Sequence, residues 1–123
     1  MKDVFVKNIE DITLKNANFR KVLFTAKHMQ LVVMSLKVGT DIGAEVHKHT
    51  DQFIRVESGV GIAILGDKKY KLKDGFAIVI PAGTYHNIVN VSKTEPLKLY
   101  TIYTPPEHKP NTIQKNKPLH DEH

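Results

Sequence analysis

The chain has 123 residues, enough for one domain and too few for two independent cores. It contains no cysteine, which excludes disulfides and thiolate ligands, so any metal must bind through imidazole, carboxylate, amide or water. The net charge of +5 comes from scattered lysines with no nucleic-acid-binding motif beside them. We therefore expect no nucleic-acid partner, and the charge favours a small anionic substrate instead.

The first residues, MKDVFVKNIEDI, lack the apolar stretch and the small-residue cleavage site of a signal peptide. No apolar run approaches the roughly 18 residues needed to cross a bilayer. We therefore expect a cytoplasmic protein without a membrane partner.

Short β-like runs separated by turn residues follow one another through most of the chain, with no long helical periodicity. We expect strands at residues 19–26, 30–38, 46–49, 53–57, 61–65, 70–72, 76–80, 85–91 and 97–103. Their spacing of about ten residues favours a sandwich, jelly roll or barrel over any βαβ fold. The predicted fold class is all-β.

Three regions follow from this pattern. Residues 19–104 hold the strands and form the predicted barrel, after a short N-terminal segment over residues 1–18. From residue 105 onward prolines alternate with charged residues, so we expect residues 105–123 to form no packed strand and to be a polar tail, on the surface or disordered.

Three histidines occupy positions where strands can hold them. His47 and His49 are two residues apart, so on an extended strand both side chains project from one face. Gln52 follows closely, and His86 comes much later, after the turn Pro81-Ala82-Gly83. If the strands close into a barrel, His86 can face the first pair across the interior.

The later segment resembles the second motif of the cupin superfamily. That motif is a glycine, five residues, proline, one residue, glycine, two residues, histidine, three residues and asparagine. The chain matches it at every fixed position with Gly75, Pro81, Gly83, His86 and Asn90.

The earlier segment resembles the first cupin motif with two departures. Gln52 stands where the family usually has a glutamate ligand, with six residues between it and Gly59, and the preceding His-x-His is present as His47-Lys48-His49. The spacing from His49 to Gln52 is one residue short, and Asp41 holds the position of the leading glycine. The resemblance covers about residues 20 to 103.

The resemblance implies a small jelly-roll barrel that holds one divalent metal ion through His47, His49, Gln52 and His86. Imidazoles with one oxygen donor suit Mn, Fe, Co, Ni, Cu or Zn rather than Mg or Ca. With glutamine as the fourth ligand the protein donors would be neutral, so the ion would keep its full double charge. Two alternatives stay open: a metal-free barrel with polar residues at its mouth, and Gln52 as a partner of a ligand histidine.

Three functions are compatible with such a site. The first is a metal-dependent isomerase or lyase acting on a small sugar-like or carbonyl substrate, because some cupins with a glutamine ligand open sugar-acid rings or cyclise polyketides. The second is a metal-dependent dioxygenase, and the third is a non-catalytic module that binds a metal or small ligand.

Two further expectations concern the ends of the chain. Glu107 and His108 are acid/base candidates if the tail folds over the barrel mouth, whereas an ordinary surface tail is the favoured alternative. Small cupins usually form homodimers, and the segment from Val4 to Val6 is the expected contributor.

Overall fold

The computed structural model describes residues 3–119, so the ends of the expected N-terminal segment (1–2) and of the expected tail (120–123) lie outside the described residues. One short helix precedes the strands. The elements are α1 (Ile9–Lys15), β1 (Arg20–Thr25), β2 (Gln30–Leu36), β3 (Asp51–Ser58), β4 (Val60–Leu65), β5 (Lys68–Lys73), β6 (Ala77–Ile80), β7 (His86–Asn90), β8 (Leu97–Thr104) and β9 (Ile113–Gln114).

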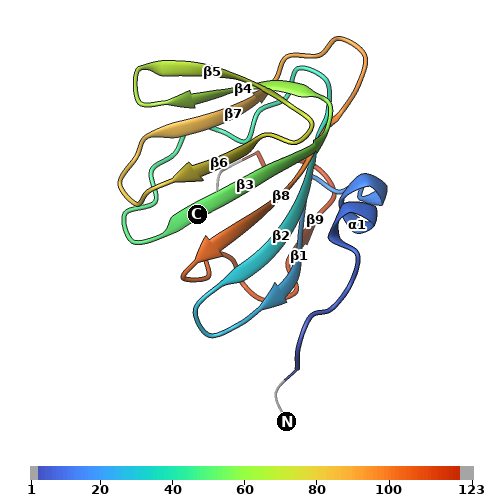
Figure 1. Ribbon diagram of the computed structural model, residues 1–123, viewed down its shortest axis with the longest axis vertical. Coiled ribbons are helices and arrows are strands. Elements are labelled where there is room, and N and C mark those ends of the chain that lie inside the picture. Colours follow the sequence, from blue (N-terminus) through green and yellow to red (C-terminus); the bar gives the residue numbers. More distant parts are fainter. Residues whose placement is uncertain (1–2, 120–123) are drawn as a thin grey trace.

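The strands form two antiparallel sheets that face each other (Figure 1). The larger sheet has the order β6-β3-β8-β2-β1-β9, and the smaller has the order β5-β4-β7. Strands that are distant in sequence, such as β2 and β8, are neighbours. This arrangement confirms the predicted all-β jelly-roll fold.

The interior of the barrel changes from polar to apolar along the strands of the larger sheet. At one end Gln30 pairs with Tyr103, which pairs with Gln52, and all three are buried. At the other end Leu36 pairs with Leu97. Since side chains alternate between faces, every second residue of β2, β3 and β8 lines this interior.

Helix α1 was not predicted, because seven residues are too few to show a helical period. The Asn8 side chain caps it by accepting a hydrogen bond from the Asp11 amide at 2.9 Å, and buried Thr13 faces the barrel.

Val4 and Val6, just before the helix, are exposed. The homodimer contact assigned to them remains a prediction.

Residues 105–119, here called the C-terminal strap, lie along the barrel wall. The Thr112 carbonyl oxygen accepts a hydrogen bond from the Val22 amide at 2.8 Å, and β9 pairs with β1. The expectation that the prolines would prevent any strand here was wrong at β9. A strand this short fits between Pro110 and Pro118, where no proline interrupts it.

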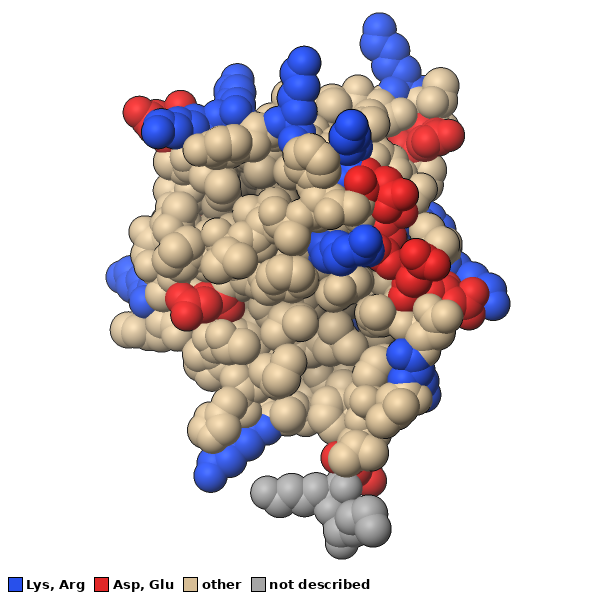
Figure 2. All heavy atoms as spheres, in the orientation of Figure 1, with Lys and Arg blue, Asp and Glu red and all other residues tan. Residues whose placement is uncertain are grey.

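The described chain has no helix that combines the length and apolarity needed to span a membrane. On the face seen in Figure 2, the Lys and Arg side chains stand apart from one another, several of them beside acidic side chains, and form no continuous basic patch.

Candidate metal centre

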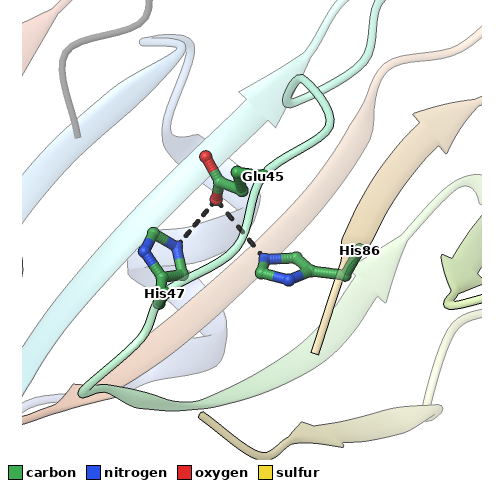
Figure 3. A group of neighbouring side chains, drawn as sticks. All are labelled: Glu45, His47 and His86. Atoms are coloured by element: carbon green, nitrogen blue, oxygen red, sulfur yellow. Dashed lines mark hydrogen bonds and ion pairs between the residues drawn. The ribbon is translucent and has the colours of Figure 1, made fainter. Parts of the chain in front are cut away.

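Glu45, His47 and His86 converge inside the barrel (Figure 3). All three are buried, and each offers one ligand atom within 4.8 Å of those of the others. Glu45 and His86 form an isolated antiparallel bridge, with 2.9 Å hydrogen bonds from each amide to the other carbonyl oxygen. This pairing places their side chains opposite each other, and His47 lies on the same face because it follows Glu45 by two residues.

The turn before His86 joins the two parts of the site. Gly83 has a φ of 86°, a conformation that a side chain would strain, and its amide donates to the His47 carbonyl oxygen at 2.8 Å. The Asp51 carboxylate accepts a hydrogen bond from the Ala82 amide at 2.8 Å. The segment of the second motif is therefore bound directly to the segment of the first, as the convergence of His86 with His47 requires.

His49 is not part of this cluster. The backbone bends at residues 48–49, and His49 is exposed whereas His47 is buried. The expectation of a strand over residues 46–49 was therefore wrong, and with it the shared face of the two histidines. Glu45 was not among the expected ligands. It is also two residues from His47, so the alternation rule could have selected it in place of His49.

Gln52 lies in β3 with its side chain buried in the interior. Its amide nitrogen donates to the Thr101 hydroxyl at 2.9 Å, and its carboxamide oxygen is buried without a hydrogen-bond partner among residues 3–119. This oxygen is available to a ligand, but direct ligation of a metal by Gln52 remains a prediction.

The tautomer of His86 is set by the turn that precedes it. Its Nδ1 lies 2.8 Å from the Thr84 carbonyl oxygen, which can only accept, so Nδ1 carries the proton. Nε2 of the neutral ring then presents its lone pair, 3.4 Å from Oε1 of Glu45. Two electron-rich atoms at this distance repel each other unless a cation or a proton lies between them.

His47 lies between two carboxylates. Its Nε2 is 2.9 Å from Oε1 of Glu45, and its Nδ1 is 2.9 Å from Oε1 of Glu107. A carboxylate on one ring nitrogen orients the imidazole and makes the other nitrogen a better ligand. Glu107 is thus placed to orient His47 from outside the cluster.

Glu107 reaches this position because Gln30 anchors the start of the strap. The Gln30 side-chain oxygen accepts hydrogen bonds from the amides of Glu107 and His108 at 3.2 and 2.9 Å, and its amide nitrogen donates to the His108 carbonyl oxygen at 2.7 Å. Gln30 is fully buried. The strap therefore folds onto the barrel mouth at this point, and Glu107 is not an ordinary surface residue of the tail.

Tyr103 packs between the strap and the cluster. Its ring meets those of His47 and His108 edge-on, with centroids 5.9 and 5.1 Å apart. Burial raises the pKa of the Tyr103 phenol, the negative charges of Glu45 and Glu107 raise it further, and Arg20 opposes this. The phenol is therefore neutral and can donate a hydrogen bond.

The donor set fits a divalent transition metal. It comprises two imidazoles and one carboxylate, and Nε2 of His86 is buried without a hydrogen-bond partner within the described chain. With Glu45 in this candidate set the protein donors carry one negative charge, whereas the set expected with Gln52 as the oxygen donor is neutral. A divalent ion here would keep one net positive charge beside its ligands.

Comparisons with known proteins agree with this fold. The Cupin domain family model matches residues 32–103. The chain is 50% identical over 118 residues to protein L612 of Acanthamoeba polyphaga mimivirus, covering 94% of this chain and 74% of that one. It is 48% identical over 119 residues to YrkC of Bacillus subtilis (strain 168), covering 92% of this chain and 63% of that longer protein.

Solved structures extend the comparison. The crystal structure of BH2720 from Bacillus halodurans is 47% identical, with a TM-score of 0.90 over 92% of this chain and 89% of that one. The structure of KdgF from Halomonas sp. is 23% identical, with a TM-score of 0.67 over 72% of this chain and 78% of that one, and shows a shared fold.

Proposed function

Because the chain belongs to the cupin family, we propose that it holds one divalent transition metal ion through Glu45, His47 and His86 and acts as an isomerase or lyase on a small sugar-like or carbonyl substrate. The observation that carries this proposal is the convergence of these three buried side chains, with ligand atoms within 4.8 Å of one another.

The bound ion would supply Lewis-acid stabilisation for negative charge on a substrate oxygen. The chain's own residues hold it and surround it with proton donors and acceptors. Glu107 orients His47 through the 2.9 Å contact to Nδ1, and the neutral Tyr103 phenol is a donor close by. Such acid/base groups favour an enzyme over a non-catalytic binding module, since proton transfer needs them near the substrate.

A metal-dependent dioxygenase is the second candidate. Two histidines and one carboxylate are the ligand set of many non-haem Fe(II) oxygenases. This ligand set competes with the first proposal, which is supported by Gln52, because its buried carboxamide oxygen has no hydrogen-bond partner among residues 3–119 and could join the set.

The decisive experiment separates the three functions by metal and by oxygen. The protein is purified with and without chelator, its metal content is measured by elemental analysis, and the chelated protein is reloaded singly with Mn, Fe, Co, Ni, Cu or Zn. Each form is incubated with sugar acids and small carbonyl compounds without oxygen and followed by proton NMR, and oxygen uptake is recorded in parallel.

Metal-dependent conversion without oxygen supports the isomerase or lyase. Oxygen uptake that depends on substrate and on Fe, Ni or Cu would overturn it in favour of the dioxygenase. A protein that binds about one ion and converts no substrate in either arm would overturn both enzyme proposals in favour of a binding module, and a protein that retains no metal would refute the centre itself.

A further inference from the structure

Arg20 is a charged side chain enclosed in the barrel. It belongs to β1, where it pairs with buried Met34, and it is only 1% exposed. Its Nη1 donates to Oε1 of Gln114 in the strap at 2.6 Å, and its guanidinium carbon lies 5.0 Å from the centroid of the Phe19 ring. Arg20 therefore points its charge toward the interior and the strap, away from solvent.

The guanidinium lacks an anionic partner. Among residues 3–119 it forms no ion pair with a carboxylate, and its Nε and Nη2 are buried without a hydrogen-bond partner. Arginine is almost never fully buried unless it is paired, because desolvating a charge costs far more than one neutral hydrogen bond returns. Nε and Nη2 are also the kind of paired donors that bind both oxygens of one carboxylate.

Arg20 shares its surroundings with the candidate metal centre through Tyr103. Arg20 lowers the pKa of the Tyr103 phenol through its charge and a side-chain hydrogen bond, whereas the charges of Glu45 and Glu107 raise it, and the Tyr103 ring packs against His47. When Glu45 and Glu107 are ionised, these two carboxylates and Arg20 together carry one net negative charge. A divalent ion at the cluster changes the net charge to one positive, and a bound monoanion would then neutralise it.

We propose that Arg20 binds the carboxylate of a small organic monoacid, with the rest of the acid directed past Tyr103 toward the metal centre. This proposal rests on the proposed function for its second half, since the acid's other oxygen, a hydroxyl or carbonyl, would face the metal. The first half, a carboxylate site at Arg20, stands without the metal.

A competing explanation is that Arg20 serves only to fasten the strap through Gln114. That role uses a single donor and leaves Nε and Nη2 buried and unpaired, whereas a carboxylate ligand would satisfy both. The two explanations predict different changes in the NMR signal of the Arg20 Nε–H when a carboxylate is added.

The chain has only two arginines, Arg20 and Arg55, which makes the test direct. The two Nε–H signals of the ¹⁵N-labelled full chain are assigned with the variants Arg20→Lys and Arg55→Lys. Acetate and glycolate are then titrated over the millimolar range into the metal-free and the zinc-loaded protein, with acetamide and sodium chloride as matched controls.

We expect the Arg20 Nε–H signal to shift saturably with both acids, while acetamide and chloride leave it in place. Arg55, which is partly exposed and paired with Glu57, is the internal control and should not follow. The variant Gln114→Ala should retain the saturable shift if the carboxylate, and not the strap, is the partner of Nε.

No saturable shift with either acid, or an equal shift with acetamide or chloride, would overturn the proposal, as would loss of the shift in Gln114→Ala. The titration uses the wild-type protein, so it remains decisive if Arg20→Lys does not fold. A shift in the metal-free protein together with failure to bind metal would refute the metal centre and leave the Arg20 site standing. Metal binding without the shift would refute the Arg20 site and leave the metal centre standing.

Discussion

The two ends of the barrel interior have opposite chemistry. One end is lined by apolar side chains. There, Met34 and Leu36 of β2 lie beside their partners Leu99 and Leu97 on the neighbouring strand β8. The other end buries Gln30, Gln52, Glu45, His47 and His86, polar side chains that lose hydration and need partners within the protein.

This contrast indicates how stability and function are divided in the fold. Burying apolar side chains stabilises the folded state by roughly 25 cal/mol per Å² of apolar surface, whereas a buried polar group contributes only about 0.5–1.5 kcal/mol when it is paired and costs about 1–3 kcal/mol when it is not. We therefore expect substitutions at the apolar end to change the free energy of unfolding, and substitutions at the polar end to change metal binding.

The largest effect is expected from His47→Ala. It removes an imidazole from the cluster, so zinc affinity should fall by more than the roughly 10–100-fold that loss of an outer partner costs. His49→Ala is the matched control and should leave zinc affinity unchanged, because His49 is exposed. Competition with a chromogenic chelator measures both, and an equal loss in the two variants would return His49 to the ligand set.

Leu99→Ala should destabilise the metal-free protein by about 2–5 kcal/mol, since Leu99 is fully buried and its truncation leaves a cavity. Urea unfolding gives this value, and Leu119→Ala, at an exposed position in the strap, should stay within about 0.5 kcal/mol of the wild type. Zinc affinity of the folded Leu99→Ala protein should be unaffected. A large loss of affinity would show that the two ends are coupled.

Glu107→Gln tests the link between the strap and the polar end. The change weakens the hold on Nδ1 of His47 and should lower zinc affinity about 10–100-fold, with a small change in unfolding free energy. Glu95→Gln, at an exposed position, is the control. Unchanged affinity in Glu107→Gln would mean that Glu107 does not orient His47.

The smallest effect is expected from Lys117→Met, outside the interior. Lys117 forms an ion pair with Asp41 and thereby lowers the pKa of that carboxyl below its ordinary value of 3.8. Since the pair is partly exposed, its loss should cost no more than about 1 kcal/mol at neutral pH.

The pH dependence of Lys117→Met has a definite sign. A carboxyl whose pKa is lowered by folding stabilises the protein above the unfolded value and loses this contribution as pH falls through the folded pKa. The difference between wild type and variant should therefore be full at neutral pH, shrink as pH falls past 3.8 and vanish below the lowered pKa of folded Asp41. Lys109→Met is the control, and a difference that grows in acid would refute the pairing.

Much of the fold was predictable because the pattern is local. Turn residues bounded most strands correctly, and the alternation of side chains along a strand puts Gln52, Ile54 and Val56 on one face of β3, where all three are buried. Helix α1 and strand β9 were missed because each is too short to show a period and depends on contacts with the barrel.

The sequence by itself determined that the chain is all-β and that His47 and His86 are candidate ligands. Both inferences depend on neighbouring residues, namely the alternation along strands and the turn Pro81-Ala82-Gly83 before His86. Only the tertiary structure decided that Glu45, and not His49, lies beside His47 and His86, and that Glu107 reaches His47. The bend at residues 48–49 and the path of the strap are set by partners far along the chain, such as Gly83 for His47 and Gln30 for Glu107. Hydrogen bonds between distant residues leave no period in the sequence.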